Sequence, residues 1–252
     1  YPGLMAHASP INSVGDALHI RKLIMNRVEM AELEEDADRK SRLLTFAVVG
    51  SGQRACGTAE EIAAMLTTAK SSYAVLEEHG WTVNLYEDIK VPFSDFEADI
   101  RPRVERLLSD AGVTIEKDRE MAAVTEEGIV FTNGDRAPAS LVVNSCFTMP
   151  TLQVDGITLS WPLETDETLK VQHLDHVWNA FPPSGMNQGR GGFRRYTTTS
   201  DWMDLGQHAG GNAWAASQGY APQRFSFKHR WVMAFNMGRH SVARLMGVLV
   251  SG

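Results

Sequence analysis

One glycine-containing segment of the sequence has the spacing of a phosphate-binding turn. Residues 50–55 read Gly-Ser-Gly-Gln-Arg-Ala and match the pattern G-x-G-x-x-G/A. In this pattern the first glycine permits a tight turn, the second lets the backbone approach a pyrophosphate, and the small third residue lets a helix and a strand pack closely. The amides of the helix that follows would face the phosphates with a favourable dipole. We therefore predict a dinucleotide site whose cofactor-binding residues here are Gly50, Ser51, Gly52, Gln53 and Ala55.

An acidic residue downstream has the type and position to complete this site. Glu87 directly follows a predicted strand, and a carboxylate there can accept hydrogen bonds from the adenine ribose hydroxyls, which favours NAD over NADP. Its distance along the chain from the turn exceeds the usual ~20 residues, because two helical segments intervene. A strand–turn–helix that binds no ligand is the alternative, and the context of the pattern favours the dinucleotide site.

The elements around the turn predict an α/β fold. A nearly continuous apolar run at 43–49 is typical of a strand buried on both faces of a parallel sheet. Further strands are expected at 82–86, 113–115 and 141–143, and a hairpin at 122–138 with a turn at Asn133-Gly134. Helices are expected at 13–35, 58–70, 72–79, 100–111 and 205–216, with the charged stretch 32–42 as an exposed turn.

Three other patterns suggest chemistry, and in each a structural interpretation is favoured. Cys56 beside the glycine turn is either a reactive thiol or a small packing residue. His173 and His176 lack further metal ligands at a defined spacing, so we expect a surface loop and no metal site. The stretch 189–196 resembles an arginine–glycine RNA-binding tract, but one copy in an acidic chain indicates a loop.

Composition and charge limit the possible functions. Lys and Arg total 24 against 31 Asp and Glu, a net charge of −7, so we expect no nucleic-acid partner. Two cysteines ninety positions apart indicate a cytoplasmic protein without a disulfide framework. No apolar run approaches the ~20 residues that span a bilayer, and no signal peptide is evident. The chain begins with Tyr1 and not with Met, which suggests a piece of a longer protein.

In several stretches, in order over nearly the whole chain, the sequence resembles the type II NADH dehydrogenases. These flavoproteins pass electrons from NADH to quinone. The stretches that carry the resemblance lie at 7–21, 45–52, 58–62, 107–113, 165–178, 207–209 and 238–243.

The resemblance implies a Rossmann-like NAD(H)-binding domain at 41–150, after a helical lead-in at 1–40. Residues 151–252 then resemble the returning, C-terminal part of an FAD-binding domain. It also implies FAD as a cofactor beside NAD(H), quinone as the acceptor, and a cytoplasmic protein peripheral to the membrane surface. Gln207 and His208 match family positions at a helix N-terminus that faces the flavin, although an ordinary helix start is an equal alternative.

Departures from the family pattern keep a second function open. Phe181 and Pro182 occupy the positions of a Gly-Asp pair that binds flavin, and Gly57 replaces a glutamate near the nicotinamide. The alternative to an FAD-dependent NADH:quinone oxidoreductase is a non-catalytic relative, a structural or assembly subunit of a larger membrane complex. The C-terminal segment 230–252, rich in Met, Val and Arg, is compatible with a membrane-surface segment, a core helix or a partner interface.

Overall fold

The computed structural model describes residues 1–50, 52–87, 100–117, 119–146, 152–154, 156–159, 163–180, 199–226, 232–245 and 248–251. The chain forms two compact units. Unit 1 comprises Tyr1–Phe147, Phe235–Val242 and Val250–Gly252, and unit 2 comprises Thr148–Ala234 and Ala243–Leu249.

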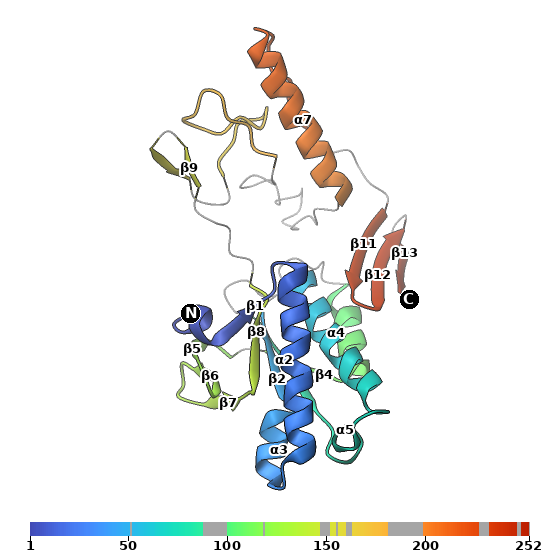
Figure 1. The fold of residues 1–252 in the computed structure, drawn as a ribbon. Coiled ribbons are helices and arrows are strands. Elements are labelled where there is room, and N and C mark those ends of the chain that lie inside the picture. The colour runs from blue at the N-terminus through green and yellow to red at the C-terminus, as the bar shows by residue number, and fades with distance from the viewer. Residues whose placement is uncertain are drawn as a thin grey trace. The chain divides into compact units, whose positions relative to one another are not determined.

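Unit 1 is built on a five-stranded parallel sheet with the order β1-β8-β2-β3-β4 (Figure 1). Val49 is in register with Tyr86 and with Asn144, so three strands end together at one carboxyl edge. The strands are β1 (Ala8–Pro10), β2 (Thr45–Val49), β3 (Thr82–Tyr86), β4 (Val113–Glu116) and β8 (Leu141–Asn144).

Helices cover one face of this sheet. Helix α4 (Gly52–Ala69) packs on β2, β3 and β4 and against α6 (Arg101–Asp110), whereas α2 (Val14–Leu33) packs on β1 and β8. Both α2 and α4 lie in front of the sheet in Figure 1. The short helix α5 (Ala74–Glu78) contacts α2 and α4, whereas α1 (Leu4–His7) contacts β1 and β5 (Met121–Thr125).

A second, antiparallel sheet covers the opposite face. It consists of β5 (Met121–Thr125), β6 (Gly128–Phe131) and β7 (Arg136–Pro138) in that order. Its apolar side chains share a core with Ala47 and Val49, alternate residues of β2 that point to the same face. The intervening Phe46 and Val48 are fully buried as well, which explains why this strand is apolar throughout.

The structure confirms the α/β fold class and most of the expected elements. The expected strand 82–86 and the long helix after Ser13 are present, and Gly80 and Gly112 end their helices at positive φ (73° and 87°). The expected hairpin is a three-stranded meander. The turn at Asn133-Gly134 joins β6 to β7, and a second turn joins β5 to β6.

The interpretation of 32–42 as a turn was wrong. Residues Ala37–Leu43 form helix α3, and the carboxylate of Asp36 caps it by accepting the Arg39 N–H at 2.9 Å. No residue of this helix is buried. Water therefore solvates these charged side chains, as expected. An exposed helix leaves them in contact with water as well as a turn does.

The N-terminal forty residues contribute to the same sheet as the glycine turn. Strand β1 pairs with β8, and α2 packs on both strands. The segment expected as a helical lead-in is thus part of unit 1.

Unit 2 contains a short antiparallel pair, β9 (Leu152–Val154) with β10 (Ile157–Leu159), and helix α7 (Thr199–Ser217). The side chain of Asn212 in α7 donates to the carbonyls of Thr168 and Gln223, each at 2.8 Å, and accepts the Gln223 N–H at 2.8 Å. These bonds attach α7 to two loops of the unit.

The C-terminal segment forms three strands, β11 (Val232–Met237), β12 (His240–Leu245) and β13 (Val248–Ser251), in one sheet. Of the three alternatives left open for this segment, the core helix was therefore wrong. Among the residues described, no helix is both long and apolar enough to cross a membrane.

Candidate nucleotide-binding site

The glycine turn joins β2 to α4 at the carboxyl edge of the sheet. Gly50 has φ +151°, and its N–H donates to the carbonyl of Tyr86 at 3.1 Å. A Cβ at position 50 would lie 3.0 Å from the carbonyl carbon of Ser145 and 3.2 Å from the Cβ of Ala55. The positive φ and these tight distances favour glycine at this position, between two strands and a helix.

The other predicted residues of the turn open helix α4. Gly52 has φ +73° and is its first residue, Gln53 is half-buried, and Ala55 is fully buried. Ser51 lies outside the described residues. The first amides of an 18-residue helix thus stand next to the carboxyl ends of β2 and β8, the geometry in which helix N-termini bind phosphate.

Arg54 anchors this turn to the loop after β1. Its guanidinium donates to the carbonyl of Ile11 and, at 2.7 Å, to Oδ1 of Asn12. The side chain is part-buried and packed along the protein surface. These bonds hold Arg54 against the protein, so we assign it to the support of the turn.

Ser145 presents a buried hydroxyl at the same place. The residue follows β8 and is 2% exposed, and its N–H donates to the carbonyl of Val49 at 2.8 Å. Its Oγ has no hydrogen-bond partner among the residues described. A buried polar group without a hydrogen-bond partner destabilises the folded state. A bound ligand is one way to supply that partner. A close-packed glycine and an unsatisfied hydroxyl fit a nucleotide at this edge.

Glu87 lies directly after β3, as predicted, but it is not alone. Its side chain is 6% exposed and pairs with Nη2 of Arg101 in α6 at 3.1 Å. Glu105 accepts bonds from Nε of Arg101 (2.9 Å) and Nζ of Lys117 (2.7 Å) through the same oxygen. Burial raises the pKa of Glu105, but the bonds from Lys117 and Arg101 outweigh it and hold that pKa below its ordinary value.

Cys56 is a core residue and not a reactive thiol. It is fully buried in the second turn of α4. Burial, with a smaller contribution from the negative charge of Glu87, raises the pKa of the thiol strongly. A thiol that stays protonated is a poor nucleophile, so the packing interpretation is confirmed.

Gln207 and His208 do not stand at a helix start. Helix α7 begins at Thr199, so both residues lie within it, and the helix-start interpretation was wrong. Gln207 is exposed. His208 bonds through Nε2 to the carbonyl of Gln223 at 2.8 Å and packs edge-on against Phe225. The two residues belong to unit 2, while the glycine turn and Glu87 belong to unit 1.

The remaining candidates form no metal site among the described residues or lie outside them. His173 and His176 are exposed in a turn, as expected, and the described residues contain no group of His, Cys, Asp or Glu that would hold a metal. Phe181, Pro182 and the stretch 189–196 lie outside the described residues. Gly57 lines a mainly apolar groove of about 530 Å³ between α2 and α4.

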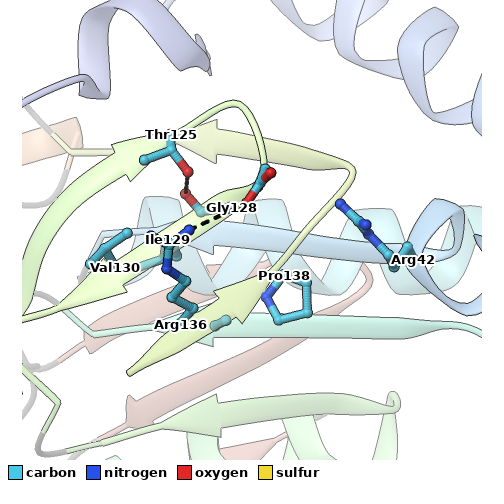
Figure 2. A pocket seen from close by; sticks show the side chains of 9 residues that line it. Arg42, Thr125, Gly128, Ile129, Val130, Arg136 and Pro138 are labelled. Atoms are coloured by element: carbon cyan, nitrogen blue, oxygen red, sulfur yellow. Dashed lines mark hydrogen bonds and ion pairs between the residues drawn. The ribbon is translucent and has the colours of Figure 1, made fainter. Parts of the chain in front are cut away.

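A second hollow lies over the antiparallel sheet (Figure 2). It has a volume of about 230 Å³ and includes Thr125, Gly128 and Pro138, with the exposed Arg42 and Arg136 at its rim. The hydroxyl of Thr125 is satisfied by the carbonyl of Gly128 at 3.2 Å, and Arg136 pairs with Glu127 at 3.3 Å. Thr125 and Arg136 thus already bond to groups of the protein. The hollow is also smaller than the ~300 Å³ at which ligand pockets begin, so we assign it no ligand.

Sequence reasoning missed Ser145, Arg101 and Lys117. Arg101 is 14 positions after Glu87 at the start of a predicted helix, and Lys117 comes two positions after the predicted strand 113–115. The available signal was Lys117, a charge opposite in sign to Glu87 that lies near the carboxyl end of the neighbouring strand. The unsatisfied state of the Ser145 hydroxyl has no sequence signal.

Comparisons with known proteins show what the chain is similar to. No protein-family model matches the sequence. The type II NADH:quinone oxidoreductase Ndh of Mycobacterium tuberculosis is 29% identical over 129 residues, which are 51% of this chain and 28% of that protein. The external alternative NADH-ubiquinone oxidoreductase of Yarrowia lipolytica is 26% identical over 125 residues, 50% of this chain and 20% of that protein. The matched region is thus less than a third of either relative.

Solved structures support the same fold. NDH2 from Plasmodium falciparum in complex with NADH superposes with a TM-score of 0.71 at 13% identity, over 100% of this chain and 68% of that one. The sulfide:quinone oxidoreductase of Aquifex aeolicus gives 0.59 at 11% identity, over 100% and 61%. The sequence relatives confirm the resemblance drawn from the sequence, and the structures confirm the fold class. Both sequence relatives are named as oxidoreductases, so they give the non-catalytic alternative no support.

Proposed function

We propose that this type II NADH dehydrogenase-like chain binds NADH at the Gly50–Ala55 turn, as part of an FAD-dependent NADH:quinone oxidoreductase. The observation that carries the proposal is the pairing of a tightly packed glycine at positive φ with the buried hydroxyl of Ser145, which has no hydrogen-bond partner among the described residues. The names of the sequence relatives supply the reaction.

In this proposal each part of the site has one task. The first amides of α4 bind the pyrophosphate, and Gly50, Gly52 and Ala55 allow its close approach. Glu87 accepts hydrogen bonds from the adenine ribose. If FAD is held by this protein, it would supply the hydride-accepting redox chemistry between NADH and quinone. Because the quinone is a membrane molecule, the protein acts at the cytoplasmic membrane surface.

Flavin binding is the part of the proposal that depends on the resemblance. Gln207 and His208 are its candidate ligands in α7. In the same unit the indole N–H of Trp178 is buried without a hydrogen-bond partner among the described residues, and a donor of this kind fits a polar cofactor. No step is assigned to these residues.

The test is a titration of the purified protein with NADH, followed by flavin absorbance and NADH fluorescence. We expect bound flavin to bleach on addition of NADH and to recover when quinone is added. A colourless protein that neither binds nor oxidises NADH would refute the proposal. NADH binding without flavin would support the non-catalytic relative instead.

A further inference from the structure

The residues around Glu87 form a cluster of opposite charges at the carboxyl ends of β3 and β4. Glu87 follows β3, Arg101 and Glu105 lie on α6, and Lys117 follows β4. Arg101 bonds both carboxylates, and Glu105 bonds both cations. The cluster lies where the nucleotide proposed above would place its adenosine ribose.

The charges in this cluster conflict with a simple preference for NAD. A lone carboxylate at this position binds the 2′-hydroxyl and repels a 2′-phosphate, whereas a nearby arginine accommodates that phosphate. Both kinds of residue are present. The charge of Glu87 is offset by Arg101 at 3.1 Å, and Glu105 brings a second cation, Lys117, to the same place.

The two cations are also the more accessible members of the cluster. The side chain of Glu87 is 6% exposed and that of Glu105 26%, against 37% for Arg101 and 38% for Lys117. The two cations are therefore more accessible to an anionic group from solvent than either carboxylate. A third cation, Arg119, is held elsewhere, since it pairs with Asp135 at 3.2 Å and stacks on the ring of Phe131.

We propose that Arg101 and Lys117 form a 2′-phosphate subsite, so that the protein accepts NADPH as well as NADH. The inference rests on the proposed function, because it places the adenosine end of the same nucleotide. Guanidinium–phosphate bonds are charge-assisted and geometrically specific, which makes Arg101 the principal ligand and Lys117 the second. Glu87 then binds the remaining ribose hydroxyl.

The experiment compares equilibrium binding of NADH and NADPH, together with the fragments 5′-AMP and adenosine 2′,5′-bisphosphate. In the unaltered protein we expect the affinities for the two dinucleotides to agree within about tenfold. Arg101→Met should weaken the binding of NADPH and of the bisphosphate by about tenfold or more, which is the loss expected for one charge-assisted bond. It should change the affinity for NADH much less. Lys117→Met should act in the same direction with a smaller effect.

Two further variants separate binding from folding. Arg106→Met removes an exposed arginine from the same helix and should leave both affinities unchanged. Because Arg101→Met removes the Arg101 ion pair from the buried Glu87 carboxylate, the double variant Glu87→Gln/Arg101→Met tests the same loss without that charge.

Three outcomes decide between the two proposals. Binding of NADH with no detectable NADPH binding would overturn the 2′-phosphate subsite and leave the proposed function intact. Equal losses for both dinucleotides in Arg101→Met would show that Arg101 only supports Glu87. Failure to bind either dinucleotide would overturn the proposed function itself.

Discussion

At the residue scale, we expect the proposed nucleotide turn to depend on two small groups, the hydrogen of Gly50 and the hydroxyl of Ser145. The first leaves room for close backbone packing, and the second is a polar atom buried without a partner among the described residues. Each can be tested by adding or removing a single group.

Gly50→Ala should weaken NADH binding by about tenfold or more and lower the free energy of unfolding by about 1–3 kcal/mol. The new Cβ would press on the backbone of Ser145 at 3.0 Å, and alanine rarely adopts this φ. Gly134→Ala is the control, because Gly134 also has positive φ but open space around it. Urea unfolding and an NADH titration measure both effects, and equal effects of the two substitutions would contradict the prediction.

Ser145→Ala should separate stability from binding. Removing an unsatisfied hydroxyl should leave the free energy of unfolding unchanged or raise it by about 1 kcal/mol, while NADH binding weakens. Ser140→Ala is the contrast, since its hydroxyl donates to the carbonyl of Leu43 at 2.8 Å and its loss should destabilise the protein. A Ser145→Ala protein that is less stable but binds NADH normally would show that the hydroxyl has a structural partner.

At the scale of elements, what was predictable from sequence depended on whether the signal was local. Strand 45–49 is apolar on both faces, and α2 carries the capping box of Ser13 and Asp16, so both were predictable within a few residues. Helix 37–43 has no apolar face and was missed. The C-terminal strands were missed because Met, Val and Arg occur in them without a clear period of two.

The capping box of α2 should make part of the stability depend on pH. Hydrogen bonds from the backbone of Asn12 and from Ser13 lower the pKa of Asp16. A carboxyl with a lowered folded pKa stabilises the fold above its unfolded value of about 3.9, and this contribution is lost as the pH falls through the folded pKa. Asp16→Asn should therefore be less stable than the unaltered protein at neutral pH, with the difference shrinking below about pH 4.

Urea unfolding at a series of pH values measures this difference. Asp38→Asn is a suitable control, because Asp38 is an exposed carboxylate in the first turn of α3 and is not a capping residue. A difference for Asp16→Asn that stays constant over the whole pH range would contradict the assignment.

In unit 2, the hydrogen bonds of the Asn212 side chain hold α7 to two loops. Asn212→Ala removes three hydrogen bonds of a residue that is 3% exposed and takes away the Asn212 partner of the Thr168 carbonyl and of the Gln223 N–H. We expect the free energy of unfolding to fall by about 2 kcal/mol or more. Gln207→Ala, an exposed site on the same helix, should change it little. Tryptophan fluorescence follows the transition, and equal stability of the two variants would contradict the expectation.

At the scale of the whole molecule, unit 1 is assembled from segments far apart in sequence. Glu60 in α4 is 2% exposed and accepts the N–H of Arg239 at 2.7 Å and pairs with Nδ1 of His240 at 2.8 Å. Gly238, at φ +55°, lies so close to Glu60 that no Cβ would fit. This contact spans 180 positions, and no local pattern in the sequence predicts it.

We expect Glu60 to keep the 238–240 turn attached to the helix that begins at the nucleotide turn. Glu60→Ala removes both acceptors, so the Arg239 amide should lose most of its protection against hydrogen exchange. Glu60→Gln keeps one oxygen as an acceptor and should lose less, while Glu61→Ala, at an exposed neighbouring carboxylate, should change little. Hydrogen exchange of residues 235–242 measures the effect. If protection in Glu60→Ala matched that in Glu61→Ala, the strands alone would hold the turn, and the carboxylate would be buried for another reason.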